Sequence, residues 1–160
     1  MRTAIYPFTP KTNLKIKVGQ FWPIKLKNGT YACGLVLDIP PRESKDTKNV
    51  FIGLLNWTGK DKPSKLVLEN SDVCVIEQGK AHIKTISSCG ESIEGEIEIE
   101  KTKIQISEQV DSSGYGLHSC VVKGFKILRK SDPIDHKNLT TEGTWGYNYI
   151  NIIADKRLNT

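Results

Sequence analysis

Cysteine, histidine and long apolar runs are all scarce in this sequence, and each shortage excludes a class of protein. The four cysteines form no CxxC pair and the three histidines stand in no catalytic signature, which argues against a zinc module or a triad hydrolase. The longest uncharged apolar run, 50–55, is far shorter than the ~20 residues that cross a bilayer. The first residues also lack the apolar core of a secretory signal. We therefore expect a cytoplasmic protein without membrane contact, whose cysteines are reduced and mostly buried.

Sequence motifs for cofactors are absent as well. The chain contains no P-loop, no GxGxxG and no zincin motif. His118 and Cys120 would share one face of an expected strand and resemble the beginning of a zinc site. A structural zinc site needs four ligands, however, and no second pair follows. The sequence therefore predicts a binding protein rather than an enzyme, with no catalytic residue, no cofactor and no metal.

The spacing of turn residues predicts the fold class. Short apolar segments are separated by turn signals every 8–15 residues, which is typical of a β-sandwich or barrel. A length of 160 residues suits one domain. We predict a mostly-β (β-rich α+β) fold in which residues 1–13 form an arm and residues 14–160 form one barrel-like or sandwich domain. About seven or eight strands and one or two short helices are expected.

Alternation of apolar and polar residues locates the expected strands. Asn28-Gly29 is a strong hairpin signal because both residues tolerate positive φ. In the returning strand, Gly34 marks a bulge or a close backbone approach. Residues 79–88 fit a strand or a short helix, with a weak preference for helix. The expected strands cover 14–18, 24–27, 31–39, 50–57, two short stretches within 66–75, then 93–100, 117–128 and 147–153.

Residues 93–100 alternate strictly between apolar or small residues and glutamate. On a strand this places four glutamates on one face: Glu94, Glu96, Glu98 and Glu100. The face is a candidate toxin-binding surface for a basic partner, or, alternatively, a solvated face or charge ladder opposed by lysines of the same chain. The apolar phase changes between Ile99 and Ile104, so a bulge or turn is expected within 100–103.

The N-terminal part of the chain is basic and carries interleaved aromatic residues. Residues 1–65 contain 12 Lys/Arg and 4 Asp/Glu, a net charge of +8, whereas residues 66–112 contain 4 and 10, a net −6. Small basic barrels bind single strands by stacking bases on aromatic side chains. The alternative is that the lysines face solvent and the aromatics fill the core. The candidate nucleic-acid-binding residues are Lys15, Lys17, Trp22, Lys25, Lys27, Arg42 and Trp57.

The segment 17–37 resembles the opening of the immunity-protein 26 family of bacterial toxin antidotes. The resemblance comprises a Gly-x-Phe step, a short apolar strand, an Asn-Gly turn and a Tyr-x-x-Gly-x-Val-Leu strand. It covers the first 40 residues or so after the arm. It implies a non-enzymatic, cytoplasmic antitoxin whose partner is a cognate toxin, and it carries over no catalytic residue. A basic β-barrel that binds nucleic acid is the alternative function. The matching residues are Gly19, Phe21, Ile24, Leu26, Gly29, Tyr31, Gly34, Val36 and Leu37.

Overall fold

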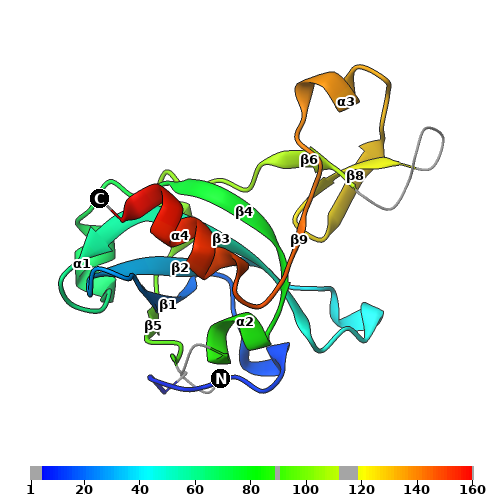
Figure 1. Ribbon diagram of the computed structural model, residues 1–160. Coiled ribbons are helices and arrows are strands. Elements are labelled where there is room, and N and C mark those ends of the chain that lie inside the picture. Colours follow the sequence, from blue (N-terminus) through cyan, green and yellow to red (C-terminus); the bar gives the residue numbers. More distant parts are fainter. Residues whose placement is uncertain (1–4, 89–90, 112–118, 160) are drawn as a thin grey trace.

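The computed structural model describes residues 5–88, 91–111 and 119–159 (Figure 1). Within these residues the chain forms nine strands in two sheets and four short α-helices, so the predicted mostly-β fold is confirmed. No helix among them is long and apolar enough to span a membrane. The strands are β1 (Gln20–Lys25), β2 (Tyr31–Asp38), β3 (Asn49–Gly59), β4 (Val75–His82), β5 (Gly95–Glu96), β6 (Glu108–Val110), β7 (Cys120–Lys123), β8 (Lys126–Lys130) and β9 (Thr144–Trp145). The helices are α1 (Lys65–Glu69), α2 (Lys84–Ser87), α3 (Asp135–Asn138) and α4 (Tyr149–Leu158), with 3-10 helices at Asn13–Lys15, Arg42–Ser44 and Ile99–Lys101.

The main sheet has six strands in the order β5-β1-β2-β3-β4-β9. Neighbouring strands are antiparallel, except that β4 and β9 are parallel. The edge strands β5 and β9 contain two residues each and do not pair with each other, so the described sheet is open rather than closed into a barrel. The expected counts of strands and helices were too low. One reason is that residues 135–145, which we expected to be loop, include α3 and β9.

The β1–β2 hairpin confirms the Asn28-Gly29 prediction. The two strands pair in antiparallel register on either side of this turn. Gly29 has φ +89°, a left-handed conformation that glycine adopts without steric cost. The Asn28 side chain accepts a hydrogen bond from the Thr30 amide at 2.9 Å, which stabilises the turn locally.

Gly34 explains how β2 packs against the largest core side chain. The strand register shifts between Ala32 and Gly34, as the predicted bulge requires. A Cβ added at Gly34 would lie 2.3 Å from the ring of Trp22, which stands on the paired strand and is 1% exposed. The predicted irregularity at Gly34 is therefore confirmed, but the group that approaches closely is the Trp22 indole, a side chain, rather than another backbone segment.

Both faces of the main sheet are buried. The helices α2 and α4 and the N-terminal segment cover one face, and α1 and residues 97–106 cover the other. Figure 1 shows α4 lying across the first face. Alternating residues of β1 and β2 therefore belong to different cores. The first core includes Trp22, Ile24, Val36, Ile52, Ile83, Ile86, Ile150 and Ile153. The second includes Phe21, Cys33, Leu35, Phe51, Leu55, Leu68, Ile97 and Ile104.

The strand predicted at 147–153 is wrong, since α4 occupies this part of the chain. The buried residues of α4 are Ile150, Ile153 and Ala154, at helical spacings of three and four. Only that spacing places all three side chains against the sheet. The strands predicted within 66–75 are also partly wrong: α1 begins after Ser64, whose side chain accepts a hydrogen bond from the Val67 amide as an N-cap.

The strand predicted at 14–18 is wrong for a different reason. Asn13–Lys15 forms a 3-10 helix, so Leu14 and Val18 are exposed while Ile16 is 1% exposed. The segment 5–13 packs against the domain: Phe8 forms a β-bridge with Ile93, and the buried Asn13 side chain donates hydrogen bonds to the carbonyls of Asp46, in the loop before β3, and Asn49, the first residue of β3.

Two further segments contain more than one element. Residues 79–88 contain the end of β4 and the short helix α2, so the expected helix covers only 84–87. The single strand predicted at 117–128 is a hairpin instead, in which β7 and β8 are joined by Gly124 and Phe125. Gly124 has φ +62°, which permits the tight turn. Residues 117 and 118 lie outside the described part of the chain.

The second sheet has the order β6-β7-β8 and projects from one end of the main sheet (Figure 1). The β7–β8 turn joins the two sheets, because the Asp38 carboxylate at the end of β2 accepts a hydrogen bond from the Phe125 amide at 2.8 Å. The Phe125 ring also packs edge-on against Phe51 of β3, with 6.4 Å between ring centres. We call these contacts of Asp38, Phe51 and Phe125 the junction.

Candidate functional site

The four glutamates do not form the continuous strand face that their alternation predicted. β5 contains only Gly95 and Glu96, so Glu98 follows the strand and Glu100 belongs to the 3-10 helix at Ile99–Lys101. The Ile97 amide donates to the carbonyl of Gly19, beyond the beginning of β1, so the partner strand ends here. The 3-10 helix is the turn expected near 100–103, and it begins one residue earlier.

Lysines of the same chain oppose two of these carboxylates. Lys62 lies 3.5 Å from Glu94, and Lys101 lies 3.0 Å from Glu98. Such exposed pairs contribute little to stability, because water screens them. They nevertheless lower the charge that this surface presents to a basic partner. Toxin binding by Glu94, Glu96, Glu98 and Glu100 stays a prediction.

The basic residues predicted for nucleic-acid binding are exposed, but Trp22, the main candidate for stacking on a base, is buried. Trp22 is 1% exposed and belongs to the first core, so it cannot stack on a base in this fold. Trp57 is half-buried and packs against the second core. The prediction that these tryptophans form a stacking surface is therefore wrong for Trp22. The exposed cations are Lys15, Lys17, Lys25, Lys27 and Arg42.

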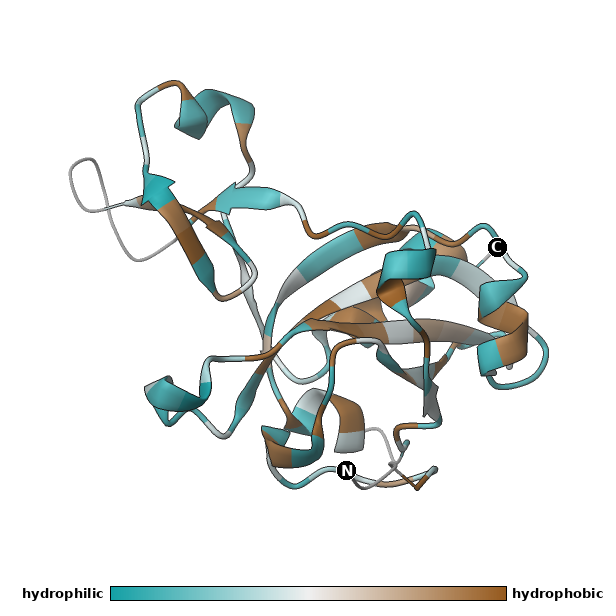
Figure 2. Cartoon of the chain, turned by 180° about the vertical axis from the view of Figure 1, so that it is seen from behind, coloured by the Kyte–Doolittle hydropathy of each residue, from teal (hydrophilic) through white to brown (hydrophobic). Residues whose placement is uncertain are grey.

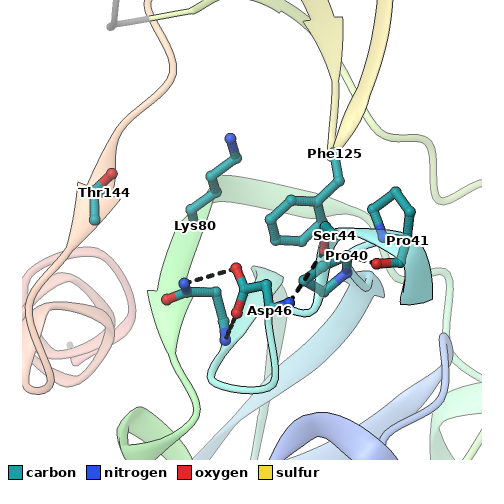
Figure 3. Close-up of a pocket in the computed structure, with 8 residues that line it drawn as sticks. Pro40, Pro41, Ser44, Asp46, Lys80, Phe125 and Thr144 are labelled. Atoms are coloured by element: carbon teal, nitrogen blue, oxygen red, sulfur yellow. Dashed lines mark hydrogen bonds between the residues drawn. The ribbon is translucent and has the colours of Figure 1, made fainter.

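An open cleft of about 540 Å³ lies beside the junction (Figure 3). Its cation, Lys80, lies 3.0 Å from the Glu142 carboxylate and 5.1 Å from the centre of the Phe125 ring. Partial burial raises the pKa of Asp46, but hydrogen bonds from the Asn49 side chain and nearby amides outweigh it, and the pKa is lowered overall. Both charged side chains that line the cleft thus have partners within the protein. The cleft presents no converging set of free polar groups for a small ligand.

The cysteines are less buried than predicted. Of the three that the structure describes, Cys33 is buried, Cys120 is half-buried and Cys74 is exposed. Burial raises the pKa of the Cys33 thiol, which leaves it protonated and unreactive. No group of three or more metal-ligating side chains occurs within the described residues. His118 lies outside them, so the suggested pair with Cys120 is untested.

A surface on the second sheet combines exposed apolar side chains with cations. We define the β8 surface as residues 126–130 together with Ile134. Ile127 is 67% exposed, Leu128 37% and Ile134 56%. In Figure 2, β8 is brown in its middle and teal at both ends, where its charged residues lie. Large apolar side chains left in water are typical of protein-binding surfaces.

An ion pair holds α3 against β8. The Arg129 guanidinium donates two hydrogen bonds of 2.8 Å to the Asp135 carboxylate, and the Asp132 amide donates a third at 2.7 Å. The bonds from Arg129, followed by the one from Asp132, lower the pKa of Asp135 to about 2. This arrangement fixes the segment that carries Ile134 relative to β8.

His136 and two buried serines form a second contact between α3 and the small sheet. The Nε2 atom of His136 lies 3.0 Å from the Ser119 hydroxyl and 3.3 Å from the Ser131 hydroxyl. Both serines are at most 9% exposed, and neither lines the cleft beside the junction. Asp135, the acid next to this histidine, is engaged by Arg129. The cluster therefore positions α3 rather than presenting a nucleophile.

Acid should loosen the contact between α3 and β8. The folded-state pKa of Asp135, about 2, lies below the unfolded value of about 3.9. The unfolded chain therefore binds more protons in this range, and the stability that Asp135 contributes is lost as the pH falls from about 4 to about 2. We expect Asp135→Asn to remove this part of the pH dependence of unfolding, whereas Asp132→Asn, at an exposed residue 4.0 Å from Arg129, should not. Unfolding curves recorded between pH 6 and 2 test this, and an identical acid response of wild type and Asp135→Asn would contradict it.

Comparisons with known proteins add no relative: no family model, no curated protein and no solved structure matches this chain. The surfaces of the chain itself are therefore the guide to its function. The β8 surface differs from other exposed apolar residues, such as Leu66 of α1 and Ile152 of α4, because it lies on an edge strand. We take it as the candidate functional site.

Proposed function

We propose that this chain is an immunity protein, an antitoxin that binds a cognate bacterial toxin in the cytoplasm and neutralises it by direct contact, without catalysis. The observation that carries the proposal is the β8 surface, where Ile127, Leu128 and Ile134 are exposed beside cations. An apolar centre with a charged rim is typical of surfaces that bind another protein. The resemblance of residues 17–37 to the immunity-protein 26 family supports a toxin as the partner.

The physical requirements of an antitoxin also favour this function over nucleic-acid binding. A blocking protein needs a fixed surface complementary to its target, and the ion pair of Arg129 with Asp135 fixes this one. Binding of single strands would need exposed aromatic rings beside the cations, and Trp22 is buried. The remaining cations predict only weak oligonucleotide binding that disappears at moderate salt concentration.

Growth rescue tests the proposal. The C-terminal domain of the protein encoded immediately upstream is expressed in bacteria from an inducible promoter, with and without this chain. We expect that the domain alone arrests growth, that this chain restores growth, and that the two proteins purify as a stoichiometric complex. Absence of a toxic domain upstream, or an arrest that this chain does not relieve, would show that the proposal is wrong.

Charge reversal tests the remaining prediction for the glutamates. Replacing Glu96 and Glu98 with lysine should leave thermal stability nearly unchanged, because among the described residues Glu98 has only an exposed lysine partner, and Glu96 interacts with the Tyr6 hydroxyl but forms no ion pair. If these carboxylates steer a basic toxin, association should slow several-fold and depend less on salt. Stopped-flow association rates measure this effect. A clear drop in melting temperature with unchanged association rates would identify an internal charge ladder instead.

A further inference from the structure

We infer that the open edge of β8 binds an extended acidic segment of the partner as an added strand of the second sheet. This inference rests on the proposed function, because it names the part of the toxin that would be recognised and the geometry of recognition. Strand addition gives affinity through main-chain hydrogen bonds and specificity through alternate side chains.

The two edges of the second sheet differ. The outer side of β6 is covered, since Val110 bridges to Thr141 and exchanges backbone hydrogen bonds with Thr140 and Glu142 at 3.0 and 2.8 Å. On the other edge, β8 pairs only with β7 among the described strands. Within the described part of the chain, one row of backbone donors and acceptors is therefore left for a partner, except that the Lys130 carbonyl accepts a hydrogen bond of 3.4 Å from the Arg129 guanidinium.

The direction of the backbone groups can be assigned at the end of β8. The Ser131 amide donates to the Ser119 carbonyl at 3.1 Å, so it points toward β7. Because the direction of N–H groups alternates along an antiparallel strand, the Lys130 amide points away from β7, toward the open edge. The pairing with β7 skips Leu128, which makes a bulge in the middle of the strand. All five residues of β8 are exposed and thus accessible to an added strand.

Charge selects the kind of strand that can bind there. β8 contains three cations and no acid, and only Arg129 has an acidic partner among the described residues. Lys126 stands opposite Lys123 of β7, so its nearest cross-strand neighbour is another cation. Like charges in this position are destabilising, and a carboxylate on the open side would relieve the repulsion.

The same charges disfavour a second copy of this chain as the occupant. Antiparallel pairing of two β8 strands about Leu128 would place Lys126 of one copy opposite Lys130 of the other. These lysines repel each other, which is how many proteins protect their edge strands. A strand that carries several glutamates or aspartates replaces that repulsion with attraction. Its apolar residues can cover Ile127 or Leu128, both of which are exposed.

Peptide binding by the full chain tests the inference. The probe is a fluorescent heptapeptide, Glu-Val-Glu-Val-Glu-Val-Glu, and the control is the same peptide with alternate backbone amides methylated. Methylation keeps the charge and the side chains but removes the hydrogen bonds of one strand edge. In fluorescence anisotropy at 150 mM salt we expect the unmodified peptide to bind at least ten-fold more tightly. Hydrogen exchange should then slow at the amides of β8.

Matched variants place the binding on β8. Replacing Lys126 and Lys130 with glutamate should weaken peptide binding at least ten-fold. Replacing Lys25 and Lys27 with glutamate makes the same change in net charge on other exposed residues. These lie near the beginning of β2, whereas the contact of β2 with the β7–β8 turn, through Asp38, is at its other end. The second variant should bind within two-fold of wild type.

Three results of the binding experiments would overturn the inference. One is equal binding of the methylated peptide, which would mean that charge alone attracts it. Another is no binding of either peptide. The third is equally tight binding of a single-stranded oligothymidine that is lost in the Lys126→Glu/Lys130→Glu variant, which would identify β8 as a nucleic-acid surface. If that variant still neutralises the toxin, the inference fails while the proposed function stands. If the toxin is never neutralised by the wild type, the function fails independently of the peptide result.

Discussion

Replacing Trp22 with alanine is expected to lower the free energy of unfolding by about 3–5 kcal/mol, as for other large buried side chains. Trp22 is 1% exposed, and its ring fills the space above Gly34 of the paired strand. Gly34→Ala should also destabilise the protein, by about 1–3 kcal/mol, because the new Cβ would lie 2.3–2.7 Å from three atoms of the indole ring. Chemical denaturation of the single variants measures both effects.

The double variant distinguishes this packing from two unrelated losses. Once Trp22 is removed, the methyl group at position 34 enters the cavity, so Trp22→Ala/Gly34→Ala should be less destabilised than the sum of the single variants by about 0.5–3 kcal/mol. Gly146→Ala is the matched control, since a Cβ there meets nothing within 4 Å. It should change stability by at most about 0.5 kcal/mol. A stable Trp22→Ala variant that loses oligonucleotide binding would restore the nucleic-acid interpretation.

Local signals explain the parts of the fold that the sequence predicts well. The Asn28-Gly29 turn specifies the β1–β2 hairpin because the chain needs positive φ at Gly29, two residues before β2 begins. The run from Val50 to Leu55 is buried in β3, which has neighbours on both sides in the main sheet. For these elements, the turn chemistry and the apolar pattern both act within about ten residues of sequence.

The misassigned segments are those where tertiary contacts decide between two local patterns. Tyr147–Ile153 is rich in aromatic and β-branched residues, which favour strands. In α4, burial of Ile150, Ile153 and Ala154 against the sheet outweighs that preference. Their spacing was the available signal. The glutamates alternate as a strand would, but β1 offers a partner only to Gly95 and Glu96, and this depends on a strand 75 residues earlier in the chain.

The candidate site was missed because exposure, unlike strand formation, has no local signal. Ile127 and Leu128 were expected to belong to a strand, and a strand of that composition normally buries one face. They are exposed because the second sheet, as far as the chain is described, has only three strands and projects from the main sheet (Figure 1). The sequence Lys-Ile-Leu-Arg-Lys, an apolar pair enclosed by cations, was the only indication that this strand lies at an edge.

Removing the Asp38 side chain is expected to release the second sheet while leaving the main sheet intact. The carboxylate accepts the Phe125 amide at 2.8 Å, and a hydrogen bond to a charged group contributes about 1.5–3 kcal/mol. Asp38→Ala should therefore speed hydrogen exchange by about 10- to 100-fold at the amides of β7 and β8. Amides of β2 and β3 that open only on global unfolding should change much less. Asp61→Ala removes the same charge from an exposed turn and should change neither set.

Gly124 provides an independent test of the junction. It has φ +62°, and a Cβ there would lie 2.4 Å from the Asp38 carboxylate, so Gly124→Ala should displace the β7–β8 turn from the end of β2 even though Asp38 is retained. If both variants accelerate exchange in β7 and β8 alone, the second sheet is a separately opening unit whose orientation depends on the junction. A toxin that contacts only the β8 surface should then dissociate faster from both variants, since binding must first restore a fixed sheet. Equal acceleration across β2, β3, β7 and β8 would instead show that the two sheets open together, and that the junction does not control the candidate site separately.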